Sequence, residues 1–282
     1  MRVVILPTEN EASDFAAQFI SDFINENKSP VVGLATGSSV LLTYDALIRK
    51  YQLGKLSFKN TTTFNLDEYL GLPQKHPQSY RHYMNQKLFD HIDIDPKNTF
   101  IPECFKDDYE LACLDYETEI NNHGGIDLQL LGIGVNGHIG FNEPTSSLKS
   151  RTRVKTLTEN TLSKNARFFE ASESQPALAI TMGIGTIMEA QNIVLIGLGK
   201  HKSKAVAEVI EGPLSAFCPG SVLQNHQNAT IILDKLAASE LKLYDYYIQT
   251  EKMKSKYDLS LIHISEPTRP RLISYAVFCL KK

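Results

Sequence analysis

The stretch Val31-Val32-Gly33-Leu34-Ala35-Thr36-Gly37-Ser38-Ser39 joins a short apolar run to a loop of small and hydroxylated residues. Residues 40–51 follow it with apolar side chains at helical spacing. A strand that is apolar at every position, rather than at alternate positions, is typical of a parallel sheet covered on both faces. This unit of strand, loop and helix therefore predicts an α/β fold.

The same alternation recurs along the chain. Further strands are predicted at residues 3–6, 61–66, 127–133, 177–180, 192–197 and 229–233, and helices at 9–27, 79–90, 109–121, 183–189 and 203–211. Strands that alternate with helices predict a doubly wound, mostly parallel sheet with helices on both faces, a Rossmann-like arrangement. We expect residues 1–250 to form a single domain.

The last part of the chain breaks this pattern. Residues 261–282 have no helical period and are interrupted by Pro267 and Pro270. The stretch 273–282 can be back-translated into a common sequencing-library adapter that runs into poly-A. We therefore interpret residues 251–282 as a tail outside the domain and residues 261–282 as an assembly artefact; the alternative is a divergent, disordered terminus.

Composition excludes several classes of function. The formal net charge of −3 provides no basic field that would attract nucleic acid or an anionic membrane. The cysteines show no C-x-x-C spacing, and the chain has neither a signal-peptide pattern nor an apolar run of transmembrane length. We expect a cytoplasmic protein with no metal site, no nucleic-acid partner and no membrane partner.

One loop and two cationic side chains are suited to binding an anion. In the loop 36–39, a glycine allows close backbone approach, hydroxyls can donate, and the helix that follows favours negative charge at its N-terminus. The alternative is that these hydroxyls only cap the helix. Arg167 and Lys202 are candidate cations, because arginine binds phosphate bidentately and lysine acts as a point charge.

Acid–base chemistry is indicated at two further strand ends. Asp67 and Glu68 follow a predicted strand, where a carboxylate can serve as a general base; the alternative is a helix cap with a solvated acid. His138 and Glu143 occur in one glycine-rich loop after the most apolar strand. A carboxylate in such a loop can orient or charge the imidazole.

Taken together, these loops resemble the glucosamine-6-phosphate deaminase family. The stretches that carry the resemblance are Thr36-Gly37-Ser38, Thr63-Phe64-Asn65-Leu66-Asp67-Glu68-Tyr69, Gly137-His138-Ile139-Gly140-Phe141-Asn142-Glu143-Pro144, Ser150-Arg151-Thr152-Arg153, Ala166-Arg167-Phe168-Phe169 and Thr181-Met182-Gly183. They occur in the expected order within residues 1–247.

The resemblance implies a reaction and roles for named residues. Members of the family convert glucosamine 6-phosphate and water into fructose 6-phosphate and ammonium, with no cofactor and no metal. Asp67 then corresponds to the base that moves the C2 proton to C1, and His138 to the group that opens the sugar ring, assisted by Glu143 and Asn136. The residues that correspond to the phosphate site are Thr36, Gly37, Ser38, Ser39, Arg167 and Lys202.

The resemblance also raises the question of regulation. Some members are homo-oligomers that bind N-acetylglucosamine 6-phosphate at a subunit interface, and Ser146, Arg153 and Lys155 occupy the corresponding positions. The tyrosine expected near the C-terminus is out of register, and Ser215-Ala216-Phe217-Cys218 lacks the tryptophan of the allosteric members. A solvated basic face remains the alternative for Arg153 and Lys155.

Two other functions compete with this interpretation. A 6-phosphogluconolactonase has a similar fold and phosphate site, but its hydrolysis makes no use of a C2-proton base such as Asp67. A non-catalytic sugar-phosphate-sensing domain would leave both Asp67 and His138 unexplained. The motif residues, rather than the fold, therefore favour the deaminase.

Deletion of residues 261–282 is expected to leave the melting temperature and the activity unchanged, because this segment has no periodic apolar face to bury. Thermal unfolding of the full-length and truncated chains checks this. A drop of several degrees on truncation would show that the segment packs on the domain.

Overall fold

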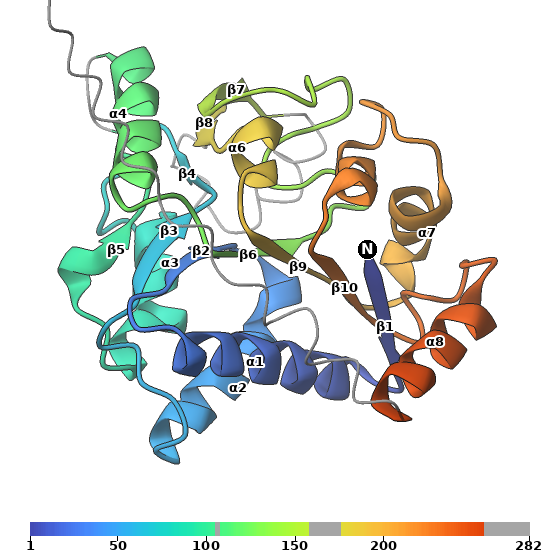
Figure 1. Ribbon diagram of the computed structural model, residues 1–282. Coiled ribbons are helices and arrows are strands. Elements are labelled where there is room, and N and C mark those ends of the chain that lie inside the picture. The colour runs from blue at the N-terminus through green and yellow to red at the C-terminus, as the bar shows by residue number, and fades with distance from the viewer. Residues whose placement is uncertain (105–107, 158–175, 257–282) are drawn as a thin grey trace, which may run out of the picture.

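Seven parallel strands form the main sheet of the computed structural model, which describes residues 1–104, 108–157 and 176–256 (Figure 1). Their order across the sheet is β1-β10-β9-β6-β2-β3-β5. The strands are β1 (Arg2–Leu6), β2 (Val31–Leu34), β3 (Thr62–Asn65), β5 (Thr99–Phe100), β6 (Leu128–Gly132), β9 (Asn192–Gly197) and β10 (Ala229–Asp234). The predicted α/β class and the mostly parallel sheet are confirmed.

Helices cover both faces of this sheet. The α-helices are α1 (Glu9–Glu26), α2 (Ser38–Gln52), α3 (Tyr80–Lys87), α4 (Tyr109–Asn122), α6 (Ile184–Met188), α7 (Ser203–Glu211) and α8 (Tyr244–Lys256). The helices α1 and α2 pack together on one face, and α4 lies on the opposite face (Figure 1). There the ring of Tyr116 meets that of Phe64 from β3 edge-on, with centroids 5.7 Å apart.

The hydrophobic core lies along the central strands of the main sheet. Leu128, Leu130 and Leu131 of β6 are fully buried, as are residues 193–196 of β9 and 231–233 of β10. Continuous burial along a strand requires cover on both faces, which the two layers of helices provide. The apolar runs of the sequence therefore correspond to the middle of the sheet.

A second, smaller sheet was not predicted. Its antiparallel strands lie in the order β4 (Asp67–Tyr69), β8 (Leu178–Thr181) and β7 (Arg153–Thr156). Residues 67–69 were expected in a loop, and residues 177–180 were grouped with the strands of the parallel sheet. Three-residue and four-residue strands with polar side chains carry too weak a pattern to be assigned from sequence.

The order of the strands creates a switch point between β2 and β6. From β2 the chain continues outward to β3 and β5, whereas from β6 it continues in the other direction to β9 and β10. The loops that leave the carboxyl ends of β2 and β6 therefore diverge and open a crevice. Such a crevice is where ligands bind in open α/β sheets.

The C-terminal helix α8 runs beside β1 at the edge of the sheet (Figure 1). Arg2 Nε donates a hydrogen bond of 3.1 Å to Glu251 Oε2 and so ties the two elements together. The described fold therefore continues to residue 256, and the segment 257–282 lies outside the described residues. No helix within the described ranges has the length and apolar character needed to cross a bilayer.

Candidate active site

A cavity of about 620 Å³ opens at the switch point. Its walls come from the loops after β2, β3, β6 and β9 and from helix α3. The predicted site residues that line it are Thr36, Gly37, Ser38, Ser39, Asp67, Asn136, His138, Glu143 and Lys202. Four loops that are distant in sequence thus converge on one space. Arg167 lies outside the described residues.

The loop after β2 has the features of a cradle for an anion. Gly37 has φ +108°, a left-handed conformation that a side chain would strain, and it precedes the first turn of α2. No side chain caps this turn and no acidic residue lies within it, so its N–H groups are available to an anion. Lys202 adds a positive charge to the same cavity, where its Nζ also donates to the carbonyl of Ile133 at 2.7 Å.

Strand β4 separates the roles of its two acidic residues. Successive side chains of a strand point to opposite faces, and Asp67 lines the cavity whereas Glu68 does not. The Glu68 carboxylate accepts hydrogen bonds from the backbone N–H groups of Tyr69, Tyr80 and Arg81, at 2.8 to 2.9 Å. Glu68 therefore holds the N-terminus of α3 in place, and Asp67 is the carboxyl that faces a ligand.

Burial changes the acidity of Asp67. Its side chain is buried, and this burial, together with the nearby charge of Glu68, raises the pKa of Asp67 from 3.8 to about 8. A carboxylate with a raised pKa is a stronger base than an exposed one, which suits it to remove a proton from carbon. The position of Asp67 in the cavity and its raised pKa indicate the same role.

His138 and Glu143 meet inside the glycine-rich loop. His138 Nδ1 lies 3.3 Å from Glu143 Oε1, an ion-pair distance that is not aligned as a hydrogen bond. Asn136 Nδ2 donates to Glu143 Oε2 at 2.6 Å, and the His138 backbone N–H donates to Asn136 Oδ1 at 3.4 Å. An imidazole beside a buried carboxylate can accept and release a proton. Asn136 holds that carboxylate in position.

Close packing fixes this loop. A Cβ atom at Gly134 would lie 2.3 Å from His138 Cε1, so only glycine leaves room for the imidazole. The carbonyl of Gly137 accepts a hydrogen bond of 2.8 Å from the Gly220 N–H. A Cβ atom at Gly140 would lie 3.4 Å from Asp67 Oδ2, which shows how closely the loop approaches the base.

Sequence reasoning missed the aromatic wall of the cavity. The rings of Tyr69, Tyr80 and Phe141 lie with centroids 4.8 to 6.1 Å apart, and all three line the cavity beside Asp67. Aromatic rings exclude water, which contributes to the desolvation of the carboxyl. Tyr69 and Phe141 stand in the recognised motifs, but no sequence signal distinguished Tyr80 from other helical tyrosines.

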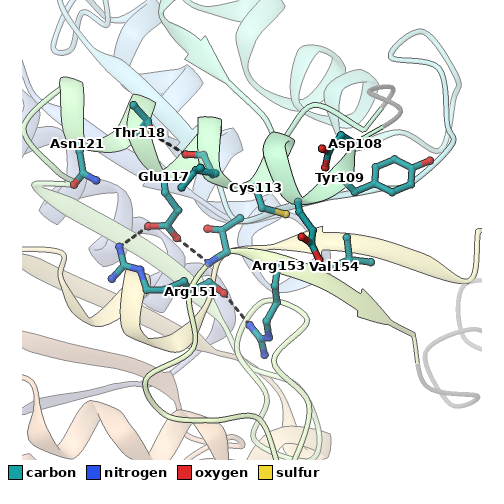
Figure 2. Close-up of a pocket in the computed structure, with 12 residues that line it drawn as sticks. Asp108, Tyr109, Cys113, Glu117, Thr118, Asn121, Arg151, Arg153 and Val154 are labelled. Atoms are coloured by element: carbon teal, nitrogen blue, oxygen red, sulfur yellow. Dashed lines mark hydrogen bonds and ion pairs between the residues drawn. The ribbon is translucent and has the colours of Figure 1, made fainter.

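A second cavity, of about 920 Å³, lies between α4 and β7 and shares no lining residue with the first (Figure 2). Arg151 pairs there with Glu117 of α4 and with Glu189. Glu117 also accepts a hydrogen bond of 2.8 Å from the Thr152 N–H. Because these groups are paired with one another, they form a structural junction between α4 and the small sheet.

The residues of the predicted regulatory set lie outside the first cavity. Arg153 and Lys155 are half-buried on one face of β7, and Ser146 is buried with no hydrogen-bond partner for its hydroxyl among the described residues. Asp67, Thr181 and Arg153 lie in register across the small sheet. Side chains in register share a face, so Arg153 lies on the same side of this sheet as Asp67.

Over residues 1–104, 108–157 and 176–256, no group of three or more His, Cys, Asp or Glu side chains is placed to hold a metal ion.

Comparison with known proteins identifies the family. A model of the family described as glucosamine-6-phosphate isomerases/6-phosphogluconolactonase matches residues 8–232, most of the chain. The chain belongs to this family. The resemblance that the sequence motifs predicted is confirmed.

Individual members are similar over nearly their whole length. The glucosamine-6-phosphate deaminase of Colwellia psychrerythraea is 54% identical over 257 residues, which is 91% of this chain and 96% of that protein. A solved structure described as a monomeric glucosamine-6-phosphate deaminase is 48% identical, with a TM-score of 0.82, and covers 85% of this chain and 99% of its own. The 6-phosphogluconolactonase of Trypanosoma cruzi has a TM-score of 0.69 at 20% identity over 86% of this chain and 97% of its own, which shows a shared fold alone.

The raised pKa of Asp67 predicts a gain in stability for Asp67→Asn that depends on pH. Between about pH 4 and pH 8 the carboxyl is ionised in the unfolded chain but protonated in the fold, so wild-type stability falls as the pH rises through this range. The neutral amide of the Asp67→Asn variant does not ionise, so this loss of stability with rising pH is absent from the variant. We expect the melting temperature of Asp67→Asn to exceed that of wild type by about 3 °C or more at pH 8 and to match it near pH 4.

Thermal unfolding at both pH values, with Asp22→Asn as an exposed control, measures this difference. A difference in melting temperature that stays constant from pH 4 to pH 8 would contradict the burial of an ionisable Asp67.

Proposed function

We infer that this protein is a glucosamine-6-phosphate deaminase, which converts glucosamine 6-phosphate and water into fructose 6-phosphate and ammonium. The observation that carries this function is the buried carboxyl of Asp67, which shares one cavity with an anion cradle and with the His138–Glu143 pair. Aldose–ketose isomerisation requires a base, a group that opens the ring and an anchor for the phosphate. The relatives that are about half identical to this chain carry the same name.

The substrate binds first through its phosphate. The cradle of residues 36–39 and the ammonium group of Lys202 provide hydrogen-bond donors and positive charge at one end of the cavity. Arg167, assigned to the same role from sequence, stays a prediction. With the phosphate fixed, the sugar extends toward Asp67 and His138.

Ring opening is assigned to His138. The C1–O5 bond breaks, the ring oxygen gains a proton, and the C1 hydroxyl loses one, which leaves an aldehyde at C1. An imidazole can carry out both proton transfers, and Glu143 Oε1 lies beside it, 3.3 Å from Nδ1. Asn136 cannot supply charge, but it orients Glu143 through its amide.

Isomerisation is assigned to Asp67. The ionised carboxylate removes the proton from C2 of the open-chain amino-aldehyde and returns a proton to C1. The C1 oxygen gains a proton and the substrate nitrogen loses one, which gives the protonated imine of the ketose with a hydroxyl at C1. Water then adds to C2, and ammonium leaves. A substrate ammonium group beside Asp67 favours the ionised form of its carboxyl, so binding itself helps to activate the base.

A lactonase uses a different set of groups. Hydrolysis of a lactone activates water toward a carbonyl carbon and moves no proton from C2 to C1. The lactonases of similar structure are 20% or less identical to this chain, a level that shows the fold alone. Asp67 therefore favours the deaminase, and it also argues against a domain that only senses a sugar phosphate.

Other expectations stay predictions. We expect the protein to act in the cytoplasm and to bind an amino-sugar phosphate without nucleic acid or membrane. A homo-oligomer with Ser146, Arg153 and Lys155 at an activator site also stays a prediction, and the similar solved structure is described as monomeric.

Assay of the purified protein on three substrates tests the function. We expect it to release ammonium from glucosamine 6-phosphate and to hydrolyse 6-phosphogluconolactone no faster than the background rate. Glucosamine, which lacks the phosphate, is expected to react at least about 100-fold less efficiently, because it forgoes the charge-assisted contacts of the cradle. Lactone hydrolysis without ammonium release would contradict the proposed function.

A further inference from the structure

One tyrosine contacts three of the loops that form the cavity. The Tyr80 hydroxyl donates to the Tyr69 hydroxyl of β4 at 3.3 Å, and its phenol also interacts with the side chain of Thr36, which lines the same cavity. Its ring stacks on that of Phe141 in the His138–Glu143 loop, with centroids 6.1 Å apart and planes 10° from parallel. The cradle of residues 36–39, strand β4 with Asp67 and the His138–Glu143 loop thus all neighbour Tyr80.

The backbone of Tyr80 is held independently of its side chain. Tyr80 is the first residue of α3, and its N–H donates to Glu68 Oε1 at 2.8 Å. Ser79 caps the same turn by accepting a hydrogen bond of 3.0 Å from the His82 N–H. Glu68 neighbours Asp67 in β4, so the base strand and the start of α3 are joined at two points, one through the backbone and one through the phenol.

We propose that Tyr80 is a positioning residue that fixes the distance between the phosphate cradle and the acid–base groups; this inference rests on the proposed function. A sugar phosphate has to place its phosphate in the cradle and its C2 proton at Asp67 at the same time. The cradle is the end of β2 and Asp67 follows β3, so sheet hydrogen bonds hold their backbones but not their side chains. The Tyr80 side chain connects the cradle to strand β4 through its contacts with Thr36 and Tyr69.

This role predicts different effects on the binding of two ligands, and both affinities can be measured without turnover. Inorganic phosphate occupies only the cradle, whereas fructose 6-phosphate spans the cavity from the cradle to the base. Loss of the Tyr80 hydroxyl leaves in place the backbone N–H groups of the cradle and the ammonium group of Lys202. It relaxes the spacing between the cradle and Asp67, so only the binding of the longer ligand is affected. A misplacement of about 1 Å can cost up to about 100-fold in rate.

The variant Tyr80→Phe keeps the ring and its stacking on Phe141 but removes both hydroxyl contacts. We expect its dissociation constant for inorganic phosphate, measured by calorimetry, to stay within about twofold of wild type. Its affinity for fructose 6-phosphate is expected to fall about 10-fold, and kcat on glucosamine 6-phosphate to fall about 10- to 100-fold.

Two further variants separate positioning from stability. Tyr116→Phe removes a buried phenol that donates to the Asn65 carbonyl outside the cavity, so it should lower the melting temperature without changing either dissociation constant or kcat. Tyr69→Phe removes the partner hydroxyl, and its effect on kcat should not add fully to that of Tyr80→Phe. Tyr69→Phe also carries the test if Tyr80→Phe does not fold.

The outcomes that overturn the proposal are specific. An unchanged kcat together with an unchanged ratio of the two dissociation constants in Tyr80→Phe would exclude a positioning role. Equal losses of phosphate and fructose 6-phosphate affinity would make Tyr80 a part of the cradle instead. Because the two dissociation constants are measured without turnover, a wild-type protein that releases no ammonium would refute the proposed function but would leave this test in force.

Discussion

All seven strands of the main sheet run in the same direction, so their carboxyl ends meet at one edge, and the chain turns away in opposite directions after β2 and β6. This divergence leaves a crevice that the core cannot fill. The strands beneath it are buried on both faces and set the positions of the loops above. The candidate active site depends on this constraint, because the loop 36–39, Asp67 and the His138–Glu143 pair, to which we assign the roles of cradle, base and ring-opening group, each follow a different strand.

Strand β4 of the small sheet places two adjacent carboxyl groups in different surroundings. Asp67 and Glu68 are adjacent in β4, but the alternation of the strand directs one toward the cavity and the other toward the N-terminus of α3. Burial raises the pKa of both carboxyls, but three backbone N–H groups offset part of this effect at Glu68, whereas the pKa of Asp67 rises to about 8. A buried carboxyl that lowers stability is consistent with the catalytic role proposed for Asp67, because active sites often lose stability in exchange for activity.

Much of this arrangement could be predicted from sequence, and the rest could not for physical reasons. The apolar runs of β6, β9 and β10 identified the parallel sheet, because full burial requires apolar residues at every position. The loops with unusual glycine, hydroxyl and carboxyl content predicted the candidate site, and most of the predicted residues line one cavity. Strand β4 was taken for a loop because three residues show no period, and Tyr80 was missed because its importance comes from side chains that meet only in three dimensions. The partition of roles between Asp67 and Glu68 likewise required the direction of each side chain.

The central claim is that Asp67 moves a proton from C2 to C1, and isotope incorporation tests it most directly. In deuterated water, wild-type protein should place solvent deuterium at C1 of fructose 6-phosphate, at least in part, which nuclear magnetic resonance of the product detects. Folded Asp67→Asn should lose deuterium incorporation and ammonium release together, whereas His138→Gln should slow turnover with Asp67 still competent. Undiminished incorporation by folded Asp67→Asn would contradict the account and assign the base to another residue.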